Sequence, residues 1–288
     1  MLQVLEALTS AVERKRLAAR HAAVFVRLSK LPPFHATALK LMNISVEGES
    51  AMEDFENAFR SDPSLTADLL LVANSAEFGV RSRIETIRHA ITFIGLERIR
   101  TLGCTIAFSF YVRNLPRSVY MRTAWSHSIA TAAIAELIGN LSQVPEMYTA
   151  GLVHDLGRMA LFLSAGEEYA TMLSGQFDSV KHSNEVETRY FGMDHEKAGA
   201  LVGKEWQFPE TLRAFMARHH DGDGGPATKP LGIVQLACRM ADAVGFPEVD
   251  RRDIGEEPNL PERLRGREEL TKDYLQSVVT RQIAAVGG

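Results

Sequence analysis

The 288-residue sequence has only two cysteines, no long apolar segment and little net charge. Cys104 and Cys238 cannot build a disulfide framework and are typical of a reducing compartment. The longest apolar stretches, such as ATAAIAELIG, are far shorter than the roughly 20 residues that cross a bilayer. A net charge of −4 and a pI near 6.2 give no general attraction to nucleic acid or anionic membranes. Since the N-terminal residues also lack the pattern of a signal peptide, we expect a cytoplasmic protein without membrane or nucleic-acid partners.

The sequence also lacks alternating strand patterns, internal repeats and low-complexity tracts. Instead, apolar residues recur at helical spacing along most of the chain, beginning with residues 2–28. Asp62 is suited to cap a helix that has Pro63 at its first position, and Gly95 is suited to end the helix before it. The sequence therefore predicts an all-α fold.

A division of the chain is expected near residues 112–120, where an apolar helix stops at a proline-containing link. We predict an N-terminal helical subdomain of residues 1–115 and a second helical subdomain of residues 116–288. Six of the nine histidines lie in the second subdomain. Residues 220–230 are glycine-rich and residues 246–269 are charged and interrupted by prolines, so we expect two loops, the second one exposed.

Asn74 and Ser75 follow the helix that starts at Asp62, and two interpretations of them are open. Asparagine tolerates the left-handed conformation that often ends a helix, and Gly79 follows shortly afterwards. Alternatively, these two residues make a polar contact between the subdomains.

Four segments of the second subdomain carry side chains of the kind that bind metal ions, namely His127, His154–Asp155, His195 and His219–His220. Imidazole and carboxylate ligands suit iron, manganese, zinc or nickel, and ligands on separate helices of a bundle can meet at one ion. Each residue also has an ordinary explanation. A helical histidine can be a hydrogen-bonded core residue, and Asp155 can pair with Arg158 three residues later. The spacing alone is a weak signal.

Several segments resemble the HDOD family, the HD-related output domain of bacterial signalling proteins. In the first half the match lies in LSKLPPFHATALKLM, SDPSLTADLLLVANSAEFG and IETIRHAITFIGLERIR. In the second half it lies in WSHSIATAAIAELIG, GLVHDLGRMALFL, YFGMDHEKAGALVGKEWQFPETLRAFMARHH and LGIVQLACRMADAVG. The resemblance covers roughly residues 25–245. It implies an N-terminal helical subdomain packed on an HD-like helical bundle.

The HDOD family is related to HD phosphohydrolases and to HD-GYP cyclic di-GMP phosphodiesterases, which implies roles for the histidines. His127 stands where those enzymes have their first histidine ligand, and His154–Asp155 matches the pair that names them. His195 matches a further ligand, and His219–His220 matches the later histidine pair.

Two positions depart from the enzyme pattern. Cys238 replaces the last aspartate ligand, for which Asp242, one helical turn later, is a weaker substitute. Arg158 replaces a lysine, and the glycine–tyrosine–proline motif is absent. A metal ion in such a pocket polarises a phosphate and activates a water molecule, so losing a carboxylate ligand leaves an incomplete cage. A cysteine thiolate still binds soft or borderline metals, and arginine holds a phosphate but rarely exchanges protons.

We therefore interpret the chain as a non-catalytic signalling module that binds other signalling proteins or a small ligand such as a nucleotide. Its metal pocket, lined by His127, His154, Asp155, His195, His219, His220 and Cys238, is expected to be partly occupied or empty. One alternative is a metal-dependent phosphohydrolase acting on a nucleotide or cyclic dinucleotide, and another is a metal or redox sensor using Cys238. A homodimer is compatible with each.

Overall fold

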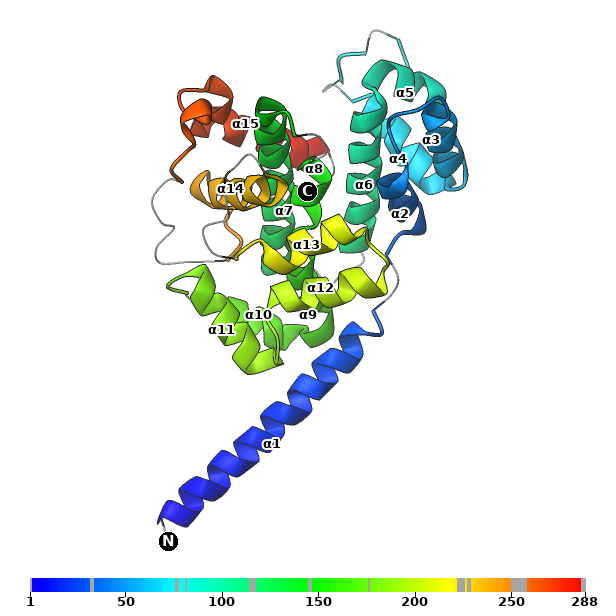
Figure 1. The fold of residues 1–288 in the computed structure, drawn as a ribbon. Helices are drawn as coiled ribbons and strands as arrows, with labels where there is room; N and C mark the ends of the chain where they lie inside the picture. The colour runs from blue at the N-terminus through cyan, green and yellow to red at the C-terminus, as the bar shows by residue number, and fades with distance from the viewer. Residues whose placement is uncertain are drawn as a thin grey trace.

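The part of the chain that the structure describes consists of helices joined by turns and loops (Figure 1). This computed structural model describes residues 2–31, 34–75, 78–80, 82–113, 118–144, 147–175, 177–221, 226, 229–249 and 258–285. No β-strand forms within these ranges, so the predicted all-α fold is confirmed. None of the helices described is long and apolar enough to cross a membrane.

The N-lobe consists of five helices, α2 (Ala36–Asn43), α3 (Ala51–Arg60), α4 (Pro63–Ala73), α5 (Ile87–Ile94) and α6 (Leu96–Arg113). Asp62 caps α4 as predicted, because its side chain accepts a hydrogen bond of 3.0 Å from the backbone N–H of Leu65. Gly95 ends α5, also as predicted. Phe55 and Phe59 of α3 are fully buried between these helices and form the centre of the lobe.

The C-lobe is built around α7 (Val119–Ser142), whose middle turns are buried by neighbours. Its other helices are α8 (Met147–Val153), α9 (Leu156–Ala165), α10 (Glu167–Leu173), α11 (Val180–Phe191), α12 (His195–Glu205), α13 (Glu210–Arg218), α14 (Pro230–Ala243) and α15 (Lys272–Ala285). Helices α8, α14 and α15 pack on α7, and α12 packs on α9 and α13. Two 3-10 helices, η2 (Glu262–Leu264) and η3 (Glu268–Leu270), precede α15.

Helix α1 (Leu2–Leu28) packs on α9, α11 and α12 of the C-lobe and projects away from the rest of the molecule (Figure 1). The division into residues 1–115 and 116–288 stays a prediction. Residues 114–117 of the expected seam lie outside the described residues, as do residues 222–225 and 227–228 of the loop expected at 220–230.

The prediction that residues 246–269 form an exposed loop is wrong at the start of this segment. Glu248 and Val249 are buried, although residues 250–257 lie outside the described part of the chain. The backbone N–H of Glu248 donates to Asp242 at 3.0 Å, and this bond directs the chain back into the core immediately after α14. The charged side chain of Glu248 is tolerated in the core because Arg158 and His220 lie next to it.

An aromatic cluster joins the two lobes. Phe34, which precedes α2, lies with its ring centroid 5.6 Å from Trp206 and 5.1 Å from Phe208, both in the C-lobe. The same ring lies 5.4 Å from Phe108 of α6, which in turn stacks on Trp125 of α7 at 5.4 Å. All five rings are buried, so this cluster holds the lobes together by both apolar burial and ring contacts.

Replacing Phe34 by alanine should lower the free energy of unfolding by about 3–5 kcal/mol, because the large cavity would lie between the lobes. Urea denaturation followed by circular dichroism measures this loss. Leu71→Ala is the matched control, since Leu71 is 73% exposed and its truncation should change stability by no more than about 0.5 kcal/mol. Equal effects of the two substitutions would contradict the role of the cluster.

Asn74 is the C-cap residue of α4, so the prediction that it ends this helix is confirmed. Its backbone has φ −93° and ψ 4°, however, and is not left-handed. Its side-chain amide donates to the carbonyl oxygens of Leu70 at 2.7 Å and Ile84 at 2.8 Å, and its carbonyl oxygen accepts from the N–H of Ile84 at 2.8 Å. Asn74 therefore ties the end of α4 to the segment before α5, within the N-lobe.

Asn74→Ala should cost about 1–3 kcal/mol, because both backbone groups of the buried Ile84 lose their partner. The free energy of unfolding measures this cost. Asn57→Ala, at an exposed position of α3, serves as the control and should stay within about 0.5 kcal/mol of the parent protein. A similar, small effect at both positions would show that the Asn74 bonds are replaced by water.

Candidate functional site

Six residues singled out from the sequence lie together inside the C-lobe. His127 comes from α7, His154 and Asp155 from the turn between α8 and α9, His195 from the start of α12, and His219 and His220 from the end of α13. Neighbouring ring centroids along the series His127, His154, His219 and His195 lie 5.3, 4.9 and 5.2 Å apart, and those of His219 and His220 lie 4.2 Å apart. All except His220 are buried.

The pair His154–Asp155 does not lie within a helix, contrary to the helical appearance of residues 151–161. Helix α8 ends at Val153, and Asp155 has φ −104° and ψ 23° just before α9 begins. Two glycines allow the close packing around this turn. An added Cβ would lie 2.7 Å from the Cα of Ala132 at Gly151 and 1.8 Å from the carbonyl oxygen of His195 at Gly157. Since neither approach admits a side chain, the glycines bring α8 against α7 and α9 against α12.

Hydrogen bonds to backbone carbonyls fix the orientation of His127 and His154. Nδ1 of His127 lies 2.8 Å from the carbonyl oxygen of Phe246, and Nδ1 of His154 lies 2.6 Å from that of Gly151. A carbonyl only accepts, so each Nδ1 carries a proton, and in the neutral form of each ring Nε2 presents a lone pair. Burial and the neighbouring His127 lower the pKa of His154 well below its ordinary value, which keeps this imidazole neutral.

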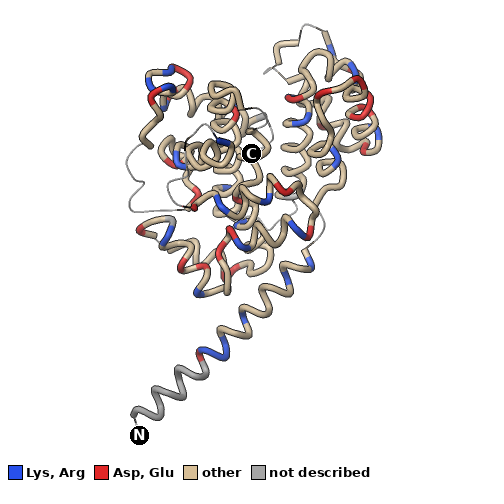
Figure 2. Tube along the Cα trace, in the orientation of Figure 1, with Lys and Arg blue, Asp and Glu red and all other residues tan. Residues whose placement is uncertain are grey.

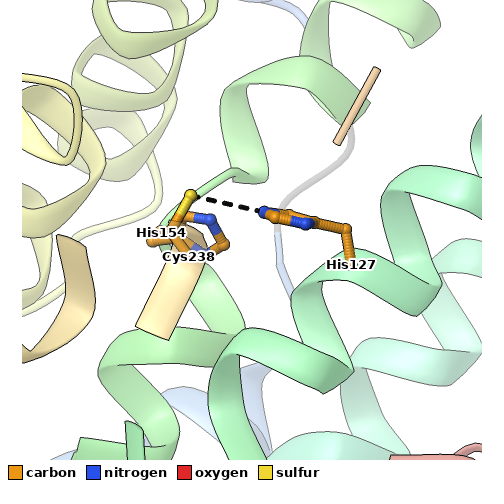
Figure 3. Close-up of side chains that lie close together, drawn as sticks. All are labelled: His127, His154 and Cys238. Carbon is orange, nitrogen blue, oxygen red and sulfur yellow. Dashed lines mark hydrogen bonds between the residues drawn. The ribbon is translucent and has the colours of Figure 1, made fainter. Parts of the chain in front are cut away.

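The Nε2 atoms of these two histidines lie close to the Cys238 sulfur. The distance between Nε2 of His127 and Sγ of Cys238 is 3.5 Å, and the hydroxyl of Thr131 lies 3.4 Å from the same Nε2. Nε2 of His154 is buried and has no hydrogen-bond partner among the described residues. Figure 3 shows the His127 ring directed at the sulfur, with His154 beside it. An unpartnered imidazole nitrogen next to a thiol fits the donor set of a metal ion.

Arg158 of α9 lies at the centre of a buried ion-pair network. Its guanidinium lies 3.0 Å from Asp155, 2.8 Å from Glu187 of α11 and 3.1 Å from Glu248. The contact with Asp155 is an ion pair without hydrogen-bond alignment, whereas the other two are hydrogen bonds. Although burial opposes ionisation, His195 and Arg158 lower the pKa of Glu187 to about 2. Burial also opposes the ionisation of Glu248, but His220 and Arg158 lower its pKa well below its usual range.

His195 and His219 form a second histidine pair that the protein itself satisfies. Both Nδ1 and the backbone N–H of His195 bond Glu187, at 2.7 and 2.8 Å, and its Nε2 lies 3.2 Å from Nε2 of His219. Burial and Arg158 act to lower the pKa of His195, but Glu187 and Asp155 outweigh them and raise it. Burial and His220 lower the pKa of His219 well below its ordinary value. When protonated, His195 donates to Glu187 through Nδ1 and to His219 through Nε2.

Two carboxylates of the site, those of Glu187 and Glu248, escaped prediction. Glu187 lies on α11, eight residues before His195, in a stretch that has no metal-ligand spacing. Glu248 lies in the segment expected to be exposed, and it accepts from Arg158 and lies 3.1 Å from Nε2 of His220. Asp242, considered as a substitute ligand, accepts from the N–H of Glu248 and lies 3.5 Å from Nδ1 of His127. Asp242 therefore positions its neighbours.

Four groups of side chains have ligand atoms within 4.8 Å of one another: His127–His154–Cys238, His195–His219–His220, His220–Cys238–Glu248 and His127–Asp155–Glu248. These donor sets suit a divalent cation, and the unpartnered Nε2 of His154 is the atom that most needs one. The metal-binding role of the predicted residues stays a prediction.

A cleft of about 780 Å³ leads from solvent to this site. Its floor includes His219, His220 and Cys238, and its walls come from α11 and α14. Three exposed basic side chains line it: Lys181, Arg189 and Arg239. The volume falls in the range of small-ligand pockets, about 300–1,000 Å³.

The fold and the site together define an all-helical protein with a buried histidine and carboxylate centre beneath an open cleft. The family model of the HDOD domain matches residues 31–222. The chain belongs to the HDOD domain family. Cys238 and Glu248 lie beyond the matched residues, so the family match does not cover these two members of the site.

Solved structures with the same fold are only distantly related in sequence. An HDOD domain protein of unknown function from Geobacter sulfurreducens is 23% identical, with a TM-score of 0.65 over 93% of this chain and 89% of that one. A protein of Shewanella amazonensis named as a phosphohydrolase is 19% identical, with a TM-score of 0.61 over 92% and 96%. A protein of Marinobacter aquaeolei named for signal transduction is 18% identical, with a TM-score of 0.63 over 93% and 64%.

A curated relative, an uncharacterised protein of Treponema pallidum, is 23% identical over 214 residues. The alignment covers 73% of this chain and 42% of the relative, so the chain spans less than half the length of that protein.

Arg158→Met should lower the free energy of unfolding by about 3–5 kcal/mol, because it leaves three buried carboxylates without their common cation. Chemical denaturation at neutral pH measures the loss. Arg218→Met is the control, since Arg218 pairs with Asp221 at the surface and should contribute less than about 1 kcal/mol. If both variants lose the same small amount, the network does not depend on Arg158.

Proposed function

We propose that this protein is a non-catalytic signalling module of the HDOD type, which acts by binding another protein or a small ligand. The observation that carries the proposal is the ion-pair network of Arg158. A permanent positive charge already lies among Asp155, Glu187 and Glu248, the carboxylates that would otherwise attract a metal ion to this side of the pocket.

Phosphodiester hydrolysis by a related enzyme needs a metal ion that polarises the phosphate and generates a hydroxide. Asp155, half of the pair that names those enzymes, faces the Arg158 guanidinium at 3.0 Å, and a second cation there would be repelled. Cys238 supplies sulfur where those enzymes have a carboxylate. Both differences weaken the binding of the hard, oxygen-preferring ions, and the proposal of a non-catalytic role rests on them.

The cleft above the histidines supports ligand binding. Its volume of about 780 Å³ suits a small molecule such as a nucleotide, whose phosphates can contact the three basic side chains, while Glu185, Asp194 and Asp242 also line the cleft. Basic and acidic residues are likewise interspersed along the helices of both lobes (Figure 2). We propose that the protein partners are other signalling proteins of the cytoplasm, and a homodimer is compatible with this role.

A metal-dependent phosphohydrolase acting on a nucleotide or cyclic dinucleotide is the second candidate function. Two observations favour it: the convergence of six residues expected from the enzyme pattern, and the direct opening of the cleft onto His219 and His220. The similar fold of a protein named as a phosphohydrolase is compatible with this candidate.

A hydrolysis assay separates the two functions. The purified chain is incubated with cyclic di-GMP, and separately with bis(p-nitrophenyl) phosphate, in the presence of Mn²⁺, Fe²⁺ or Zn²⁺. Cyclic di-GMP should be recovered intact, and the parent protein and Asp155→Ala should give the same background rate. Rapid hydrolysis that disappears in Asp155→Ala would establish the phosphohydrolase and refute the non-catalytic role.

A further inference from the structure

We propose that His127, His154 and Cys238 form a thiolate site for a single zinc-class cation. This assignment deepens the proposed binding function. It rests on that function because it treats the pocket as a binding site and not as a site of hydrolysis. It also differs from what the enzyme pattern implies, because the three ligands include no carboxylate.

The spacing of the ligand atoms suits a tetrahedral ion. With Zn–N of about 2.05 Å and Zn–S of about 2.3 Å, nitrogen and sulfur ligands of one tetrahedral zinc ion lie about 3.6 Å apart. Nε2 of His127 and Sγ of Cys238 are 3.5 Å apart, and one ligand atom from each of the three side chains lies within 4.8 Å of the others (Figure 3). A small adjustment of side chains would therefore complete three corners of a tetrahedron.

The surroundings hold both imidazoles ready to act as ligands. A metal-bound histidine usually donates its other N–H to a carbonyl or a carboxylate, which fixes the ring and its tautomer. His127 does so to Phe246 and His154 does so to Gly151, so both Nε2 lone pairs are available. The lone pair of His154 has no hydrogen-bond donor among the described residues, which is an independent sign that this fully buried atom lacks its natural partner.

The other candidate ligands have hydrogen-bond partners or lie next to the Arg158 guanidinium. His195 bonds Glu187 through one ring nitrogen and approaches His219 through the other. Asp155 faces a guanidinium, and Glu248 accepts from Arg158 and approaches His220. An ion bound by any of these residues must displace an existing partner or approach a fixed positive charge. An ion at His127, His154 and Cys238 replaces the 3.5 Å contact between thiol and imidazole and the 3.4 Å contact of Thr131 with the same imidazole.

The site is connected to solvent, because Cys238 also lines the cleft. A cation can enter there, and the thiol proton of Cys238 leaves by the same route when the thiolate binds. The fourth corner can then be taken by water or by a ligand atom from the cleft. One thiolate and two imidazoles prefer zinc and cobalt to magnesium or manganese, which require oxygen ligands.

Metal titration of the full chain tests the assignment. After removal of metals by chelation, Co²⁺ is added as a spectroscopic probe, followed by Zn²⁺ in competition. We expect one equivalent of Co²⁺ to produce a thiolate-to-cobalt charge-transfer band, and one equivalent of Zn²⁺ to abolish it while Mg²⁺ and Mn²⁺ do not. Cys238→Ser should remove the band and weaken Zn²⁺ binding by at least about 100-fold, since changes outside the ligands alone cost 10- to 100-fold.

Cys104→Ser is the matched control. Cys104, the other cysteine of the sequence, is buried in the N-lobe, and its replacement should leave the band unchanged. Circular dichroism verifies that both variants are folded. Zinc-edge X-ray absorption of the parent protein gives a second measurement that needs no variant, and should detect one sulfur ligand at about 2.3 Å.

The assignment is overturned if the parent protein binds Zn²⁺ without a sulfur ligand, if Cys238→Ser binds it equally well, or if no ion binds. None of these outcomes depends on hydrolysis. Turnover of cyclic di-GMP would refute the proposed function, whereas absence of the thiolate band in the parent protein, with cyclic di-GMP left intact, would refute the metal assignment alone.

Discussion

The interior of the C-lobe depends on one buried cation. Arg158 is 1% exposed and holds three carboxylates that come from separate parts of the chain, the turn after α8, helix α11 and the segment after α14. Through Glu187 it fixes His195, and through Glu248 it fixes His220. Such a network is costly to desolvate, and its members are stabilising only while all are present. The positions of His195 and His220 are therefore a consequence of the ion pairs of Arg158, whereas backbone carbonyls orient His127 and His154.

This network divides the pocket into two chemically different parts. On one side, charged groups neutralise one another and the imidazoles of His195 and His219 have protein partners. On the other side, Nε2 of His127 lies 3.5 Å from the Cys238 sulfur, and Nε2 of His154 has no hydrogen-bond partner among the described residues. Glu248 links the two parts, because it accepts from Arg158 while one of its oxygen atoms lies within 4.8 Å of ligand atoms of His220 and Cys238.

The helices, the cap of α4 and the group of six residues could be predicted because each has a local signal, such as apolar periodicity, Asp62 before Pro63 or a family motif around His154. Glu187 and Glu248 could not, because what makes them part of the site is a partner far away in sequence. Arg158 is 29 residues from Glu187 and 90 from Glu248. Charge and proline content suggested solvent for residues 246–269, yet a single hydrogen bond to Asp242 turns Glu248 inward. The side-chain bonds of Asn74 could not be predicted for the same reason, since Ile84 cannot be identified as its partner from sequence.

The family match ends at residue 222, but the physical unit does not. A fragment cut at the limits of the match would lose α14 and with it the surface that covers the middle of α7, where His127 is fully buried. It would also lose Glu248, so that Nη2 of Arg158 and Nε2 of His220 would both lose their carboxylate partner. Its other end, at residue 31, would remove α1 from the faces of α9 and α11. The smallest piece of this chain that can keep its interior is thus larger than the domain that sequence comparison delimits.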